Sequence, residues 1–155
     1  MNFYLWNRQD LMFRKIAVAY NESPEAERAF HCAIQLAKSL GAELSTITVA
    51  AELPAYTAFA GAAGPSLSRV LADDREKFYE LLEEKARSSA HPCGVEVQSH
   101  IVEGREVDAI VKFLRKQKID LLVMGLHQRS LHLARLWSTV YELAQEAPCS
   151  VLGVH

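Results

Sequence analysis

Five short strand-forming runs, separated by stretches with helical spacing, limit the fold of this chain more than any other feature. The runs lie at 15–20, 42–50, 94–102, 119–124 and 149–154. Short, mostly apolar runs are typical of strands buried on both faces. Because a helix-length stretch separates consecutive strands, they can pair in parallel through right-handed crossovers. The sequence therefore predicts an α/β sandwich with a five-stranded parallel sheet and helices on both faces.

The four stretches between the runs carry apolar residues at the spacing of amphipathic helices. The first has the clearest ends, since Ser23 is a good capping residue, Pro24 suits the first helical position and Gly41 is a common helix stop. The last is expected to open at Ser138 and Thr139. We expect helices over residues 24–40, 66–89, 107–114 and 139–147.

The composition indicates one globular domain without a large charged surface. Of the 155 residues, 50% are hydrophobic and 23% charged, which suits a single domain with an ordinary core. With 17 Lys and Arg against 19 Asp and Glu, the net charge of -2 gives no broad cationic field. We therefore expect neither nucleic acid nor a membrane as a partner. Cys32, Cys93 and Cys149 lie far apart without a CxxC motif, which predicts reduced thiols and a cytoplasmic protein.

Residues 1–11 are interpreted as an N-terminal extension, and the domain is expected to cover residues 12–155. The extension lacks the basic start, apolar centre and cleavage site of a signal peptide. Its apolar and aromatic residues at 3–6 suit packing on a surface or on a second subunit. A start codon assigned too early is the alternative, because Met12 lies just before the first strand.

The place to look for a ligand is the carboxyl end of the sheet, where the strand order of such folds reverses. This directs attention to the loops after the first and fourth strands. Residues 121–141 contain no acidic side chain but include Arg129 and Arg135. A helix that opens at Ser138 and Thr139 would add free N–H groups, which favour an anion such as phosphate. The alternative is that these hydroxyls only cap the helix and the arginines are solvated.

Several strings of the chain, taken together, resemble the universal stress protein family of the UspA type. They include KIAVAYNESPEAERAF near the start, VEGREVDAIVKFLRKQKIDLLVMG in the middle and STVYELAQEAPCSVLGVH at the end. The most specific pieces are the strand end at 120–125 and the segment at 147–151. The resemblance runs from about Met12 to His155. It implies a single Rossmann-like sandwich of the adenine nucleotide alpha hydrolase type, and a homodimer.

The resemblance also implies where a nucleotide would bind. Nucleotide-binding members carry three glycines and a hydroxyl residue after the fourth strand, at positions that here hold Gly125, Gln128, Ser138 and Thr139. Two glycines are therefore missing, and glycine is the residue that lets a backbone approach phosphate oxygens closely. Asn21 stands at the position of the family's first-strand aspartate. The candidate nucleotide-binding residues are Ala19, Tyr20, Asn21, Val49, Met124, Gly125, His127, Gln128, Arg129, Ser138, Thr139 and Val140.

Two outcomes are open for this site. The loss of two glycines favours weak binding of ATP or none, while AMP or another adenine nucleotide is a possible ligand. Alternatively, Gln128, Arg129 and Arg135 replace the missing backbone contacts with side-chain contacts, and the chain is a functional ATP or AMP module.

No motif in the sequence points to catalysis. We find no HExxH, no GxxxxGK[ST] and no spacing that indicates a nucleophile with its base. His91 and Cys93 share a short turn, but a metal site would need further ligands. We therefore expect no metal site and a binding module rather than an enzyme.

A protein that acts through protein interactions is the other function class. Residues 149–154 form a last strand without Lys or Glu, and an unprotected edge strand favours pairing with a second copy. We expect a homodimer through this strand. If the nucleotide site is inactive, dimerisation and stress-linked partner binding would remain.

The domain boundary gives a first testable expectation. Removal of residues 1–11 should leave the free energy of unfolding within about 2 kcal/mol of the full-length value, since burial of a single large apolar side chain contributes ~1.5–3 kcal/mol. Chemical denaturation of the full-length and Met12-start proteins would measure the difference. A larger loss would place the aromatic residues of the extension in the core or in a large interface.

Overall fold

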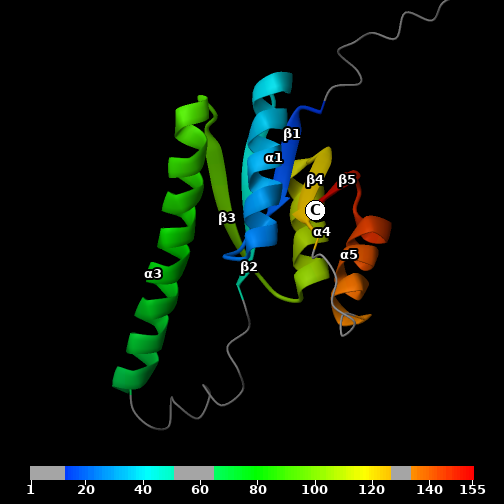
Figure 1. Ribbon diagram of the computed structural model, residues 1–155. Coiled ribbons are helices and arrows are strands. Elements are labelled where there is room, and N and C mark those ends of the chain that lie inside the picture. The colour runs from blue at the N-terminus through cyan, green and yellow to red at the C-terminus, as the bar shows by residue number, and fades with distance from the viewer. Residues whose placement is uncertain (1–12, 51–64, 127–133) are drawn as a thin grey trace, which may run out of the picture.

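The computed structural model describes residues 13–50, 65–126 and 134–155, and these residues form the predicted α/β sandwich (Figure 1). Five parallel strands make one sheet in the order β3-β2-β1-β4-β5, which confirms the predicted fold class. The predicted domain boundary at Met12 lies outside the described residues. The strands are β1 (Lys15–Ala19), β2 (Glu43–Ala50), β3 (Val97–Glu103), β4 (Leu121–Gly125) and β5 (Ser150–Val154).

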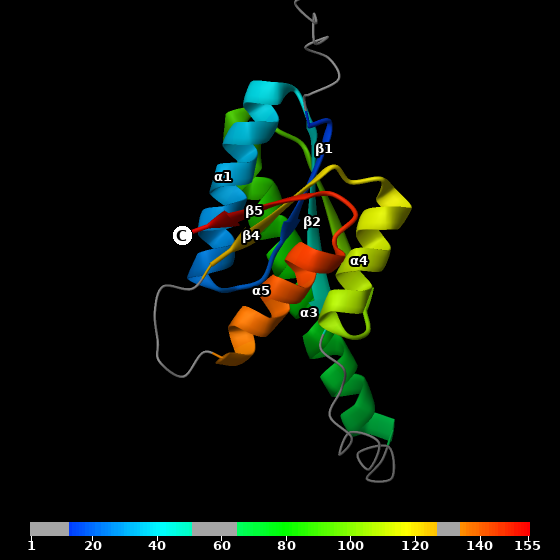
Figure 2. The same ribbon diagram turned by 90° about the vertical axis from the view of Figure 1, so that its right-hand side faces the viewer.

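Helices cover both faces of the sheet (Figures 1 and 2). One apolar layer joins the sheet to the first two helices, and a second layer joins its other face to the last two. In both views the N-terminal half of the second helix extends beyond the sheet. The helices are α1 (Pro24–Leu40), α3 (Pro65–Ala90), α4 (Glu106–Gln117) and α5 (Ala134–Glu146), and the short 3-10 helix η1 (His91–Cys93) follows α3.

The first helix is built as the sequence predicts. The Ser23 hydroxyl oxygen accepts a hydrogen bond from the N–H of Ala26 at 3.1 Å, so the cap satisfies one of the donors at the helix start. Gly41 ends the helix in the left-handed conformation, at φ 65°. Between these ends, Ala26, Phe30 and other apolar residues spaced along one face are buried against the sheet.

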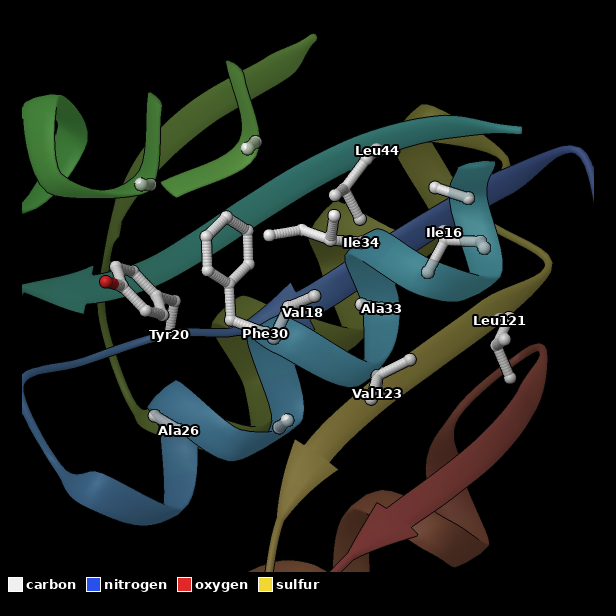
Figure 3. Packing of buried hydrophobic residues seen from close by; sticks show 14 of the residues in the cluster. Ile16, Val18, Tyr20, Ala26, Phe30, Ala33, Ile34, Leu44, Leu121 and Val123 are labelled. Carbon is white, nitrogen blue, oxygen red and sulfur yellow. The ribbon is translucent and has the colours of Figure 1, made fainter. Parts of the chain in front are cut away.

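Packing under α1 is shown in Figure 3. Alternate residues of β1, Ile16 and Val18, point into this layer and meet Phe30 and Ile34 of α1. All four are almost completely buried. Because side chains alternate along a strand, Ala17 points to the other face, where it packs with the layer under α4 and α5.

A hydrogen bond and an ion pair, both to Glu27, help to hold α3 against α1. Glu27 of α1 accepts a hydrogen bond from the Tyr20 hydroxyl at 3.2 Å and forms an ion pair with Lys85 of α3 at 2.7 Å. Burial raises the pKa of Glu27, but the hydrogen bond and charge of Lys85 together with the Tyr20 hydroxyl outweigh it, so the pKa lies below its ordinary value. Glu27 therefore stays ionised and holds both partners.

The third strand begins later than predicted. Residues 91–94 form η1 and a turn in which Gly94 has φ 72°, so the paired strand starts only at Val97 instead of at residue 94. The alternation of apolar and polar residues continues into the turn, which explains why the sequence pattern gave no sign of this boundary.

The end of β4 and the start of α1 approach very closely at Gly125. A Cβ atom at this position would lie 2.3 Å from the backbone C and O atoms of Glu25. No side chain fits there without a shift of the helix or the strand. Gly125 thus fixes the distance between the first turn of α1 and the carboxyl end of β4.

Gly125→Ala should lower the free energy of unfolding by about 1–3 kcal/mol, because the added methyl group meets backbone atoms. Gly153→Ala is the matched control at the same end of the sheet. There the new Cβ meets the end of the Leu126 side chain at 2.6 Å, which can rotate away. Denaturation of the two variants measures the contrast, and an equal, small effect at both positions would contradict the close packing of α1 on β4.

Candidate functional site

A cavity of about 300 Å³ lies at the carboxyl ends of β1 and β4, the neighbouring strands at which the strand order reverses. Ligands of parallel α/β sheets bind at this place, and the volume is at the small end of the range of roughly 300–1,000 Å³ for ligand pockets. The cavity is lined by Ala19, Asn21, Ser23, Glu25, Ala26, Glu106, Ile110, Met124, Gly125, Leu126, Thr139, Val140 and Leu143.

Half of the predicted site residues meet in this cavity. They come from three segments that are far apart in the sequence: the end of β1, the end of β4 and the body of α5. The predicted residues that line the cavity are Ala19, Asn21, Met124, Gly125, Thr139 and Val140.

Tyr20 does not line the cavity, although the sequence placed it there. Its side chain lies in the opposite layer, 4% exposed, and its ring packs on Phe30 with 5.0 Å between ring centres. Its hydroxyl donates to Glu27. Burial and the neighbouring carboxylate raise the pKa of Tyr20 far above its ordinary value. Tyr20 therefore supports the attachment of α1 and α3 rather than the cavity.

Val49 also lies outside the cavity lining. It is half-buried in β2 and packs against the apolar layer under α4. The residues that line the cavity come from β1, β4 and the helices, and none comes from β2. His127, Gln128 and Arg129 lie outside the described residues, so the predicted phosphate loop has no structural account here.

The helix that was expected to open at Ser138 and Thr139 instead begins at Ala134. Ala, Arg and Leu at 134–136 are good helix formers, which explains the earlier start. In a helix with this start, the N–H groups of Ser138 and Thr139 belong to its internal hydrogen-bond ladder. They are not free donors for a phosphate. Thr139 lines the cavity from within the helix.

Hydrogen bonds in the turn after β1 shape one wall of the cavity. The Asn21 side-chain oxygen accepts from the N–H of Ser23 at 2.9 Å, and the Ser23 hydroxyl oxygen accepts from the N–H of Ala26. Two N–H groups at the start of α1 are therefore already used within the protein. The Asn21 amide nitrogen still has the chemistry of a donor toward a ligand.

Glu25 and Glu106 are cavity residues that the site prediction missed. Both stand in the first turn of a helix, Glu25 in α1 and Glu106 in α4. The Glu25 side chain is 19% exposed, and its carboxylate lies 3.9 Å from the guanidinium of Arg28. Acidic residues favour the positive end of a helix, and this signal is present in the sequence at both positions. It did not reveal that the two helix starts share one cavity.

The remaining cavity lining is mostly apolar. Ile110, Met124 and Leu143 are buried, and Val140 is half-buried beside them. Within the described ranges, no group of three or more His, Cys, Asp and Glu side chains could hold a metal ion. A search of the same ranges finds no helix long and apolar enough to cross a membrane. The cavity thus offers an apolar wall with a few polar groups, which is the usual makeup of a small-molecule site.

Known proteins share both the sequence pattern and the fold. A model of the universal stress protein family matches residues 12–155. A universal stress protein of Methanocaldococcus jannaschii is 30% identical over 155 residues, which covers 99% of this chain and 88% of the relative.

Solved structures agree with this relationship. A universal stress protein in complex with cAMP has a TM-score of 0.71 and 24% identity, with 93% of this chain and 98% of that chain covered. A universal stress family protein of Arabidopsis thaliana with AMP bound has a TM-score of 0.65 and 19% identity, with 91% and 90% covered. The family model over residues 12–155 and the 30% identity to the Methanocaldococcus jannaschii relative lead to one conclusion: this chain belongs to the universal stress protein family.

Proposed function

We propose that this chain is a stress-response protein that binds a small adenine nucleotide or nucleoside in the cavity between β1 and β4, without catalysing a reaction. The observation that carries the proposal is the cavity itself, which joins six predicted site residues at the switch point of the sheet. Two universal stress proteins of the same fold are solved with cAMP and with AMP. These ligands share the adenine ring and one phosphate.

The cavity lining suits such a ligand. An adenine ring has apolar faces, and Met124, Val140 and Ile110 supply apolar contact area. Asn21 and the Thr139 hydroxyl can donate or accept hydrogen bonds at the polar edge of the base or at the ribose. Affinity in this arrangement comes from the base and the sugar more than from phosphates.

Binding without turnover is supported by the kind of groups in the cavity. Its described lining includes no His, Cys or Lys, so the most common general base and the most reactive nucleophiles are missing from it. The lining residue of α5 with a hydroxyl group is Thr139, and the two carboxylates of the lining belong to Glu25 and Glu106 in the first turns of α1 and α4. We propose that signalling by this protein follows from occupancy of the site.

A homodimer through β5 is the second part of the proposal. β5 is an edge strand of the sheet and pairs with β4 on one side only in this chain. Val151 and Leu152 are half-buried on its two faces, and residues 150–154 carry no charge. An uncharged edge strand favours pairing with a second copy. We place the dimer in the cytoplasm, in keeping with the three free cysteines of the described residues.

Blocking the cavity tests the ligand site. Val140→Trp fills the space beside Met124, so the affinity for AMP or adenosine should fall at least tenfold, about 1.4 kcal/mol, by calorimetric titration. Ala144→Trp is the matched control, because it adds the same side chain to an exposed position one turn further along α5. Equal affinities of the two variants, with both folded by circular dichroism, would place the ligand elsewhere.

Charging the edge strand tests the dimer. Val151→Lys and Leu152→Lys should each convert a dimer to a monomer, since a lysine disfavours edge-to-edge pairing. Light scattering gives the mass, and Tyr141→Lys is the control, because Tyr141 is 64% exposed on α5. Both strand variants must retain a cooperative melt. A native protein that is monomeric, or an unchanged dimer in both variants, would contradict pairing through β5.

A further inference from the structure

Four positively charged side chains are gathered at the C-terminal end of α4, which covers the opposite face of the sheet from α1 (Figure 2). Lys112, Arg115 and Lys116 are exposed on the helix, and Lys118, also exposed, directly follows its last residue. The first three share one face of α4, because residues three and four apart on a helix are neighbours. Residues 112–118 span roughly 9 Å along the helix axis. We call these four residues the α4 basic surface.

None of the four charges has an acidic partner within the described residues. Asp108, four positions before Lys112, pairs with Arg105 instead. The Asp120 carboxylate, which follows the surface in sequence, accepts two backbone N–H groups at the start of β1. Most other cations of the described chain do pair with a carboxylate: Lys15, Arg28, Arg75, Lys85, Arg87 and Arg105. The α4 basic surface is therefore open to a negative group from another molecule.

The needs of the helix end explain only part of this arrangement. Cations favour the C-terminal end of a helix, which accounts for Arg115 and Lys116 in the last turn. Lys112 stands one turn earlier, where the like charge of Lys116 four residues on is unfavourable. Lys118 has φ 55°, in the left-handed region that favours glycine, and no other non-glycine residue of the described chain has a positive φ. A neighbouring charge or the backbone thus disfavours lysine at two of the four positions.

We propose that the α4 basic surface binds an acidic segment of a partner protein. The planar guanidinium of Arg115 can bind a carboxylate with two parallel hydrogen bonds, and the lysines attract further carboxylates as point charges. The surface is separate from the cavity, because the cavity is lined by Glu106 at the other end of α4. The inference therefore goes beyond the proposed function and does not depend on it.

The size and makeup of the surface favour a short acidic segment over a nucleic acid or a membrane. Roughly 9 Å of positive surface matches a few carboxylates, whereas a nucleic acid is held along a longer positive track. Proteins that bind single strands add exposed aromatic rings for stacking, and helices that lie on a membrane add exposed apolar side chains. Here Phe113 and Leu114 are buried under α4. The net charge of -2 also gives no long-range attraction to a polyanion.

The experiment measures binding of the full chain to a fluorescein-labelled peptide of eight glutamates, by fluorescence anisotropy in low salt. The native protein should bind this peptide but not the matched peptide of eight glutamines. In Lys112→Gln/Lys116→Gln the affinity should fall at least fivefold, because two of the four charges are lost. Added salt should weaken binding to the native protein, since it screens exposed charges.

Lys38→Gln/Lys77→Gln is the matched control. Lys38 of α1 and Lys77 of α3 are exposed and also lack an acidic partner in the described part of the chain, so the control removes the same charge from other helices. Its affinity for the glutamate peptide should stay within twofold of the native value.

Lys118→Gly separates binding from a structural role. Glycine accepts a positive φ without strain, so this variant should melt at a higher temperature than the native protein. Its affinity for the glutamate peptide should nevertheless fall. A higher melting temperature with unchanged affinity would overturn the assignment of Lys118 to the surface.

Three further outcomes would overturn the proposal. The first is a native protein that does not bind the glutamate peptide. The second is an equal loss of affinity in Lys38→Gln/Lys77→Gln, because the effect would then be one of overall charge. The third is tighter binding of duplex DNA or of phosphatidylserine vesicles than of the peptide, lost in Lys112→Gln/Lys116→Gln, which would assign the surface to that class of partner instead.

Discussion

Burial of β1 on both faces is the constraint on which the rest of the molecule depends. Ile16, Ala17 and Val18 are completely inaccessible to solvent, and the strand pairs with β2 on one side and β4 on the other. The apolar side chains of a strand in this position are all buried only when helices cover both faces of the sheet, because successive side chains point to opposite faces. The same central position makes its carboxyl end the switch point of the sheet. One buried strand therefore determines both the layers and the place of the cavity.

Most of the fold could be predicted because the signals are local. Strand-forming runs, the cap at Ser23 and the stop at Gly41 each act within a few residues, and the structure has them where they were expected, apart from the later start of β3. The direction in which the Tyr20 side chain points could also have been predicted from the sequence. It follows Ile16 and Val18 at a period of two, which turns it toward α1 and away from the candidate site.

The parts of the site that the sequence did not predict depend on packing between segments. Glu25 and Glu106 are 81 positions apart, and only the assembled sheet brings their helices to one cavity. Helix α5 starts at Ala134, because the residues before Ser138 are good helix formers. The sequence analysis gave more weight to Ser138 and Thr139 as a helix start. Resemblance to a family directed attention to the ends of β1 and β4, where the structure has a cavity, but gave no information on the acidic residues that line it.

Contacts with the rest of the domain are distributed unevenly along α3. Its buried residues Leu82, Ala86 and Ala90 all lie toward its C-terminal end, and the ion pair from Lys85 to Glu27 is in the same half. Before these residues, the side chains are mostly exposed: Val70 is 54%, Phe78 42% and Leu81 70% exposed. Residues 72–81 of α3 therefore gain little from tertiary contacts within the described part of the chain, and opening this stretch costs less free energy than unfolding the sheet. We therefore expect the amide protons of residues 72–81 to exchange with solvent through local opening, and those of β1 to exchange only through global unfolding.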